Sequence, residues 1–373
     1  MCKESTRILL IGNCYYSVFR FRKELIQRLI KEGYEVWTAF PNGEHDEQER
    51  GEETAKEYGC HFIELSMSRR SMNVINEIKY IVQVNKLIKA ICPQMVLLYT
   101  IKPNLYGGLL SHLHRTPYII NVTGLGSAFN RNRIIAWVLK KMYLVVMNSS
   151  FYTFFQNEHD HEYFNENINH RNVKVLPGSG VNTEEYYLQP YHDGDVVRFL
   201  YMSRVMKEKG IEEFLQAASY FKDYPNIEFV ICGDCEECYE ERLQQLEKEG
   251  NVHYLGQISD VRCVIKDSDC IVHPSYYNEG ISNVLLEASS CGRAIITTEK
   301  SGCKEVVDAG KNGFVIPTRD SHELIKAIKR FIDIDREQKI AMGREGRKLV
   351  EKSFDRNKVI NEYLKVIGMA VQQ

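Results

Sequence analysis

Short apolar runs alternate with amphipathic stretches along almost the whole chain. The first apolar run occupies residues 7–11, and a polar break separates it from residues 19–31, where apolar side chains recur at helical spacing. Gly33 ends this predicted helix, and residues 34–40 form a second apolar run. Apolar strands joined by helices are typical of a parallel sheet that is covered by helices on both faces.

The same alternation continues in two blocks. The first block predicts strands at 61–65, 95–99, 118–121, 152–156 and 173–176, with helices at 74–91 and 134–146. The second block begins with a strand at 196–202. It predicts strands at 228–232, 253–255, 270–273 and 294–297, and helices at 211–221, 240–248, 261–266, 282–291 and 322–331. A polar, breaker-rich segment at 188–196 lies between the blocks. We therefore expect an α/β protein with Rossmann-like doubly wound domains at 1–188 and 196–355 that face each other across a cleft.

Charge and composition exclude several classes of protein. The 373 residues include 48 Lys and Arg against 50 Asp and Glu, a balance that argues against a nucleic-acid partner. The longest apolar runs are far shorter than the roughly 20 residues of a membrane span. The first residues are polar and charged, so we expect no signal peptide. The 11 cysteines are odd in number and scattered, which favours a cytoplasmic location.

The segment 273–292, HPSYYNEGISNVLLEASSCG, carries candidate chemistry at the end of a predicted strand. Ser282 is a good N-cap for the helix that follows, and the backbone N–H groups of residues 280–283 suit an anion. Glu287 lies in an otherwise apolar helix, where a carboxylate is costly without a hydrogen-bonding partner such as a hydroxyl-rich ligand. The alternative is an exposed Glu279 and a Glu287 that a neighbouring loop satisfies.

The segment 203–210, SRVMKEKG, follows the first strand of the second block. Arg204 and Lys209 can both point from this loop toward the cleft, where two fixed cations would stabilise a departing diphosphate without a metal. The alternative is that both charges are merely solvated. GxxxxGK[ST] is absent, and the nearest GxGxxG, at 124–129, has Phe129 in place of its third glycine, which disfavours P-loop enzymes and standard dehydrogenases.

These segments together resemble the GT-B glycosyltransferases, and specifically the retaining family 4 enzymes. Glu279 and Glu287 stand as E-x7-E, and SRVMKEKG is similar to the phosphate-gripping loop of the family. Further similarity lies in segments 155–157, 178–182, 301–307 and 312–315. Segments 100–108 and 120–129 resemble transferases that build capsule, O-antigen or other glycan chains on undecaprenyl diphosphate. The resemblance implies the GT-B fold, with a C-terminal helix at 356–373 that packs back on the first domain.

The resemblance also implies roles for single residues. Arg204 and Lys209 would hold the donor diphosphate, Glu279 the sugar hydroxyls and Glu287 the ribose. The other expected donor-binding residues are Gly12, Gln257, Ile258, Gly280, Ile281, Ser282 and Asn283. Expected on the acceptor side are Lys102, Asn104, Thr123 and Gly124; many family members have His-Gly where Thr123-Gly124 stands here. Neither a metal nor another cofactor is expected.

The expected function is transfer of a sugar, with retention of configuration, from a UDP-sugar to a saccharide linked to polyprenyl diphosphate. N-acetylhexosamine is the expected sugar. A polyprenyl-linked acceptor implies contact with the anionic inner face of the cytoplasmic membrane. Residues 130–146 could supply this contact, with Arg133, Trp137, Lys140 and Lys141 on one helical face. The alternative is a helix with Ile134, Val138, Met142 and Val145 in the core and a solvated basic side.

Two other functions and one metal site remain as alternatives. A nucleotide-sugar 2-epimerase uses a similar fold, but no acid–base set for proton transfer at carbon accompanies the E-x7-E segment. A non-catalytic nucleotide-sugar-binding module is the other. Cys232, Cys235 and Cys238 form CxxCxxC, which would need a fourth ligand to hold zinc or an iron–sulfur cluster.

Overall fold

The computed structural model describes residues 5–41, 47–66, 73–126, 129, 132–168, 172–236 and 238–372. The chain divides into two compact units. Unit 1 comprises Met1–Ser179 and Asn357–Gln373, and unit 2 comprises Gly180–Arg356. The division falls at residue 180 rather than between 188 and 196, because Val181 is tied to the end of unit 2. Its N–H donates to Phe354 O at 2.9 Å, and its carbonyl accepts from Arg356 N at 3.0 Å.

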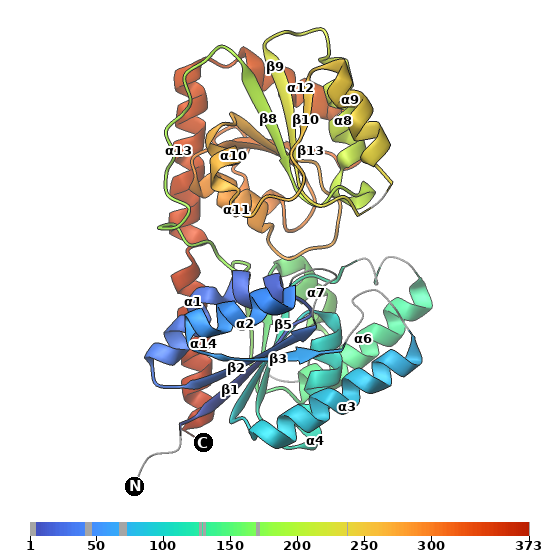
Figure 1. Cartoon of the computed structure of the whole chain (residues 1–373), viewed down its shortest axis with the longest axis vertical. Helices are drawn as coiled ribbons and strands as arrows, with labels where there is room; N and C mark the ends of the chain where they lie inside the picture. The colour runs from blue at the N-terminus through green and yellow to red at the C-terminus, as the bar shows by residue number, and fades with distance from the viewer. Residues whose placement is uncertain are drawn as a thin grey trace. The chain divides into compact units, whose positions relative to one another are not determined.

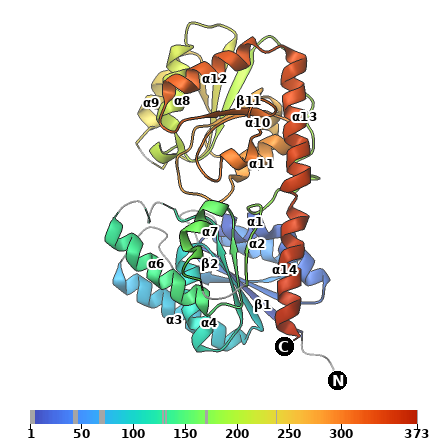
Figure 2. The same ribbon diagram turned by 180° about the vertical axis from the view of Figure 1, so that it is seen from behind.

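Unit 1 contains a parallel sheet with the strand order β3-β2-β1-β4-β5-β6-β7 (Figure 1). The strands are β1 Arg7–Ile11, β2 Glu35–Pro41, β3 His61–Leu65, β4 Met95–Tyr99, β5 Tyr118–Val122, β6 Tyr152–Phe155 and β7 Val173–Val175. α1 (Phe21–Lys31) and α14 (Arg356–Val371) bury their apolar side chains against one face of this sheet. α3 (Val74–Ile91), α4 (Gly108–Leu113) and α6 (Arg133–Asn148) pack against the other face (Figure 2). Two further helices are α2 (Glu47–Tyr58) and α7 (Glu158–Asn165).

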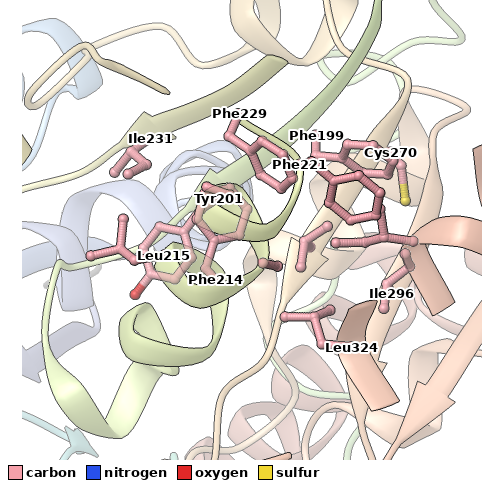
Figure 3. Packing of buried hydrophobic residues seen from close by; sticks show 14 of the residues in the cluster. Phe199, Tyr201, Phe214, Leu215, Phe221, Phe229, Ile231, Cys270, Ile296 and Leu324 are labelled. Carbon is pink, nitrogen blue, oxygen red and sulfur yellow. The ribbon is translucent and has the colours of Figure 1, made fainter. Parts of the chain in front are cut away.

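Unit 2 contains a second parallel sheet with the order β10-β9-β8-β11-β12-β13. The strands are β8 Val197–Met202, β9 Ile227–Cys232, β10 Val252–Tyr254, β11 Cys270–His273, β12 Ala294–Thr298 and β13 Gly313–Ile316. The core on one face combines residues of α8 (Ile211–Tyr220), α9 (Glu240–Glu249) and α12 (Ser321–Asp333) with aromatic side chains of the sheet (Figure 3). α10 (Arg262–Lys266), α11 (Asn283–Ser290) and α13 (Arg336–Ser353) cover the other face.

The expected architecture of two doubly wound α/β sheets is confirmed. Five helices and strands were not predicted from the sequence: α2, α4, α7, α13 and β13. α2 and α13 are mostly polar, so their apolar periodicity is weak. α4, α7 and β13 are only 6, 8 and 4 residues long. Tertiary packing supplies the stability that their local sequences do not show.

α6 differs from the interpretation in which Ile134, Val138, Met142 and Val145 point into the core. These four side chains are exposed, with 37% to 72% of their surface accessible. The buried side of α6 is instead formed near its C-terminal end by Tyr143, Leu144, Val146 and Met147. Among the described residues, no helix is long and apolar enough to span a bilayer.

Arg293 stabilises the interior of unit 2 although it is only 1% exposed. Its guanidinium donates to seven carbonyl oxygens at 2.7–3.4 Å: those of Gln189, Pro190, Ile265, Lys266, Ser268, Cys291 and Gly292. A buried cation is tolerated when its donors are satisfied in this way. Arg293, just before β12, thus connects this strand to the end of α10, to Ser268 after it and to residues 189–190.

We expect Arg293→Met to lower the free energy of unfolding by about 3 kcal/mol or more, because it leaves several buried carbonyl groups without donors. Urea unfolding followed by circular dichroism measures this change. Arg242→Met is a matched control, since Arg242 is an arginine of the same unit that is 41% exposed and bonds Glu212. The control should lose less than about 1 kcal/mol. Equal losses in the two variants would contradict the role of Arg293.

Candidate functional site

The site of unit 2 is built around a buried ion pair at the carboxyl edge of the sheet. Lys209 lies in the short 3-10 turn Lys207–Lys209 that follows β8, and Glu279 lies in the loop that follows β11. Lys209 Nζ and Glu279 Oε2 are 2.6 Å apart, with the side chains 7% and 19% exposed. Because β8 and β11 are neighbours in the sheet, their following loops meet at one edge.

His273, the last residue of β11, lies next to Glu279 of this pair and is fully buried. Its Nε2 is 3.2 Å from Glu279 Oε1 and 3.4 Å from Ser282 Oγ. Its Nδ1 has no hydrogen-bond partner in the described part of the chain, so we assign the ring proton to Nε2, which donates to Glu279. Ser275 Oγ adds a longer contact to the same carboxylate oxygen at 3.5 Å.

These contacts fix the charge of each group. Burial acts to raise the pKa of Glu279, but the Lys209 ammonium and the hydrogen bond from His273 outweigh it and hold that pKa well below its usual range. Burial lowers the pKa of His273, so the imidazole is neutral at neutral pH. The site therefore holds an ionised carboxylate between one cation and one neutral donor.

Two glycines allow the loops of the site to approach one another closely. Gly210, at φ 80°, follows the Lys209 turn, and a Cβ there would lie 2.2 Å from Pro274 O. Gly302, at φ 92°, follows β12, and a Cβ there would lie 1.9 Å from Gly280 O. Only glycine fits such contacts without moving the backbone. The position of the Lys209–Glu279 pair therefore depends on backbone packing as well as on its own charges.

Arg204, the other predicted phosphate ligand, also has an acidic partner. Its Nη1 lies 2.9 Å from an oxygen of Glu236, in the loop that follows β9. Burial alone would lower the pKa of Arg204, but Glu236 and Tyr277 raise it above its usual value. The Tyr277 ring lies 5.4 Å from the guanidinium carbon of Arg204 and 5.0 Å from Lys209 Nζ. One aromatic ring thus contacts both cations.

The N-terminus of α11 differs in one respect from the prediction. Ser282 is the N-cap residue, but its side chain does not cap the helix, because its hydroxyl lies against His273 instead. Its own N–H donates to Gly302 O at 2.8 Å. Gly280 and Ile281 are buried just before the helix, while Asn283 at its start is partly exposed.

The remaining predicted donor residues of unit 2 lie in two places. Glu287 is 5% exposed within α11. Gln257 is exposed and Ile258 partly buried in the loop that follows β10. The structure thus brings Lys209, Glu279 and the start of α11 together in one cluster, with Arg204 joined to it through Tyr277.

The predicted residues of unit 1 lie at the carboxyl edge of its own sheet. Gly12 directly follows β1, and a Cβ there would lie 2.4 Å from Ser17 Oγ. Thr123 and Gly124 follow β5 and are partly exposed. The ammonium of Lys102 lies 2.5 Å from Glu77 Oε1, and both side chains are largely buried.

Asn104, predicted on the acceptor side, has a clear structural contact. It is fully buried, and its amide donates to Asn121 O at 2.9 Å, near the end of β5. Asn104 therefore holds this strand end, and its role on the acceptor side stays a prediction.

Among the described residues, one group of metal-ligating side chains lies close together: His273, Glu279 and Cys303, with ligand atoms within 4.8 Å of one another. Glu279 already contacts Lys209, and burial raises the pKa of Cys303 well above the usual thiol range, which opposes formation of the thiolate that a metal prefers. Cys232, Cys235 and Cys238 do not belong to such a group within the described ranges.

Three residues of the site were missed by the sequence analysis as functional candidates: His273, Tyr277 and Glu236. His273 and Tyr277 lie within the same segment as Glu279, so proximity along the chain was an available signal. Glu236 is 32 residues from Arg204, and only the pairing of β8 with β9 brings the two together.

Family models match both halves of the chain. A model described as "Glycosyl transferases group 1" matches residues 185–349, and one described as "Glycosyl transferase 4-like" matches residues 7–157. The chain is 24% identical, over 98% of its length and 99% of the relative, to the N,N'-diacetylbacillosaminyl-diphospho-undecaprenol alpha-1,3-N-acetylgalactosaminyltransferase of Campylobacter jejuni.

Solved structures share the fold. Alr3699/HepE of Anabaena, in complex with UDP and glucose, matches with a TM-score of 0.78 and 14% identity over 97% of this chain and 99% of that one. A putative UDP-N-acetylglucosamine 2-epimerase of Listeria monocytogenes matches with a TM-score of 0.71 and 15% identity over 98% and 96%. The chain therefore combines a glycosyltransferase 4-like domain with a glycosyltransferase group 1 domain on the GT-B fold.

We expect His273→Phe to reduce kcat by about 10- to 100-fold, because Glu279 loses the donor that orients it. The pKa of Glu279 should also rise, so the acid limb of the activity–pH profile should move to higher pH. His273→Gln retains an N–H donor and should restore part of both properties. Steady-state kinetics from pH 4 to 9 measure both effects.

His253→Phe is the control, since His253 is an exposed histidine on β10 of the same unit. A normal kcat and an unmoved acid limb in the His273→Phe variant would show that His273 does not position Glu279.

Proposed function

We propose that this glycosyltransferase moves an N-acetylhexosamine from a UDP-sugar to a saccharide carried on polyprenyl diphosphate, with retention of configuration. The observation that carries the proposal is the buried Lys209–Glu279 pair beside the N-terminus of α11, in a chain similar along 98% of its length to a transferase named for a diphospho-undecaprenol acceptor. The site of action would be the inner face of the cytoplasmic membrane.

The charge arrangement supports a diphosphate-bearing donor. Arg204 and Lys209 lie on one loop and contact one tyrosine ring. A diphosphate gains negative charge as its bond to the sugar breaks, and fixed cations stabilise that charge in the transition state. The complex of HepE with UDP supports UDP as the nucleotide.

The carboxylate of Glu279 supports a sugar-binding role rather than a nucleophilic one. Lys209 and His273 stabilise its negative charge, which lowers its tendency to attack carbon. An ionised carboxylate accepts strong hydrogen bonds from sugar hydroxyls. Retention would then follow from attack by the acceptor hydroxyl on the face that the diphosphate leaves, with the departing phosphate taking the proton.

We propose that the reaction needs no metal. The two cations take over the neutralisation of the diphosphate that a divalent ion performs elsewhere. The Glu279 carboxylate also accepts a hydrogen bond from the Lys209 ammonium, which would compete with a metal ion for that carboxylate.

The test is to incubate the protein with UDP-N-acetylhexosamine, a lipid-linked saccharide diphosphate and EDTA. We expect a transfer product with a retained anomeric centre and undiminished turnover in EDTA. Epimerised donor would instead identify a 2-epimerase, and binding without turnover a non-catalytic module. Loss of activity in EDTA would overturn metal independence.

The Lys209–Glu279 pair allows a sharper version of this test. Lys209→Met and Glu279→Gln each leave a buried group without its partner and should destabilise unit 2. The double variant removes both charges and should fold, yet lose about 100-fold or more in kcat. Thermal unfolding and kcat of all three variants decide the matter. A folded double variant with normal turnover would contradict the proposed site.

We expect Glu236→Gln to lower the KM for the UDP-sugar by about 5-fold, with little change in kcat, because the donor diphosphate no longer competes with a carboxylate for Arg204. Glu228→Gln is the matched control. Glu228 also bonds an arginine of β8, Arg198, at 2.7 Å, but at the opposite end of these strands. An unchanged KM in Glu236→Gln would show that Glu236 does not compete with the donor.

A further inference from the structure

Large exposed apolar side chains gather on three helices of unit 1 that cover one face of its sheet. We call this surface the α3–α4–α6 face. α4 contacts both α3 and α6. The exposed apolar residues of this face, each at least 37% accessible, are Val74, Ile75, Ile78, Val82, Leu109, Leu113, Ile134, Ile135, Trp137, Val138, Met142 and Val145. Clusters of this kind mark interaction sites, whereas single exposed hydrophobic residues are ordinary.

The residues form stripes at helical spacing. On α6, Ile134, Val138 and Val145 recur at intervals of four and seven, and Trp137 lies beside them at 61% exposure. On α3, Ile78 and Val82 continue the line begun by Val74. The buried residues of both helices point the other way, into the core of unit 1. Both helices are therefore apolar on their outward side as well as on their inward side.

The charged residues of the α3–α4–α6 face are mostly basic, which indicates an anionic partner. The three helices contain six Lys and Arg residues, namely Lys79, Lys86, Lys89, Arg133, Lys140 and Lys141, but one acidic residue, Glu77. Glu77 is bound to Lys102 and is 16% exposed. The chain as a whole has a net charge of −2, so this face is a basic exception. A basic, apolar face with a tryptophan complements an anionic bilayer surface.

The exposed apolar residues of α3 and α6 lie near the carboxyl edge of the sheet, where the predicted acceptor-side residues also lie. α3 follows β3 and α6 follows β5, so both helices start at the carboxyl edge of the sheet. The exposed apolar residues of α3 lie in its first half, and those of α6 begin with its second residue. Thr123, which follows β5, belongs to the same edge.

We propose that the α3–α4–α6 face lies on the anionic lipid surface of a bilayer and inserts Trp137, Ile134 and Val145 among the lipid headgroups. The inference rests on the proposed function for its purpose, because a polyprenyl-linked acceptor presents its saccharide at that surface. The contact needs no membrane-spanning helix. The proposed contact surface is not limited to α6, because α3 and α4 contribute about half of its exposed apolar residues.

The test is flotation of the full chain with vesicles of phosphatidylcholine, alone or with 30% phosphatidylglycerol. We expect wild type to float with the anionic vesicles and much less with the neutral ones. Lys140→Gln/Lys141→Gln should weaken binding by about 5-fold for each lysine. Ile134→Gln/Trp137→Gln/Val145→Gln should weaken it by at least about 10-fold, because three inserted side chains are lost.

Met369→Gln/Val371→Gln is the matched control, since these exposed apolar residues belong to α14 on the opposite face of the same sheet. The control should float like wild type. Equal loss in the control and in the α6 triple variant, or no flotation of wild type, would overturn the proposal. A wild-type dimer that the α6 triple variant converts to monomer, with no vesicle binding, would identify a second copy as the partner instead.

Two activity assays separate this inference from the proposed function. With an acceptor on a short, water-soluble prenyl chain, the α6 triple variant should turn over like wild type. With a full-length acceptor in anionic vesicles, it should be slower by at least about 10-fold. Transfer without vesicle binding would contradict the inference alone, and vesicle binding without transfer would contradict the proposed function alone.

Discussion

The position of the Glu279 carboxylate between the Lys209 ammonium and the His273 imidazole constrains the loops at the carboxyl edge of the unit 2 sheet. A buried Glu279 is stable only while Lys209 and His273 remain within hydrogen-bonding distance. That requirement fixes the turn after β8, the end of β11 and the loop before α11 relative to one another. Close backbone contacts of Gly210 with Pro274 and of Gly302 with Gly280 hold the same loops together. The result is a preorganised edge where charge is already in place before a ligand arrives.

The same edge is close to electrically neutral, and this has a consequence for how an anion would bind. Arg204 and Lys209 each have a glutamate partner, Glu236 and Glu279. The two pairs are not equivalent. Lys209 is buried, and the largely buried Glu279 also accepts a hydrogen bond from a neutral histidine. Arg204 is 40% exposed and can exchange its partner at lower cost. A diphosphate would therefore replace Glu236 on Arg204 more readily than it would separate Lys209 from Glu279.

The two faces of the sheet in unit 1 are covered by helices of different surface composition. One face of its sheet is closed by α1 and α14, which comes from the far end of the chain. The other face carries α3, α4 and α6, whose inner sides complete the core and whose outer sides remain apolar and basic. The fold alone does not require this outer surface, because most helices of such sheets expose charged side chains to water. This composition is the reason for our proposal that the face lies on a lipid surface.

The sequence by itself determined the alternation of strands and helices, the parallel sheets and the position of Arg204, Lys209 and Glu279 in loops that follow strands, because apolar periodicity and loop position are local properties. It did not reveal α2, α4, α7, α13 or β13, whose local patterns are weak or short, nor the start of unit 2 at Gly180. Only the tertiary structure decided that Glu236 meets Arg204, that His273 supports Glu279 and that Asn104 is buried. It also decided that Ile134, Val138, Met142 and Val145 face outward. Periodicity identifies an apolar stripe on a helix, but only packing against the rest of the chain decides whether that stripe is covered.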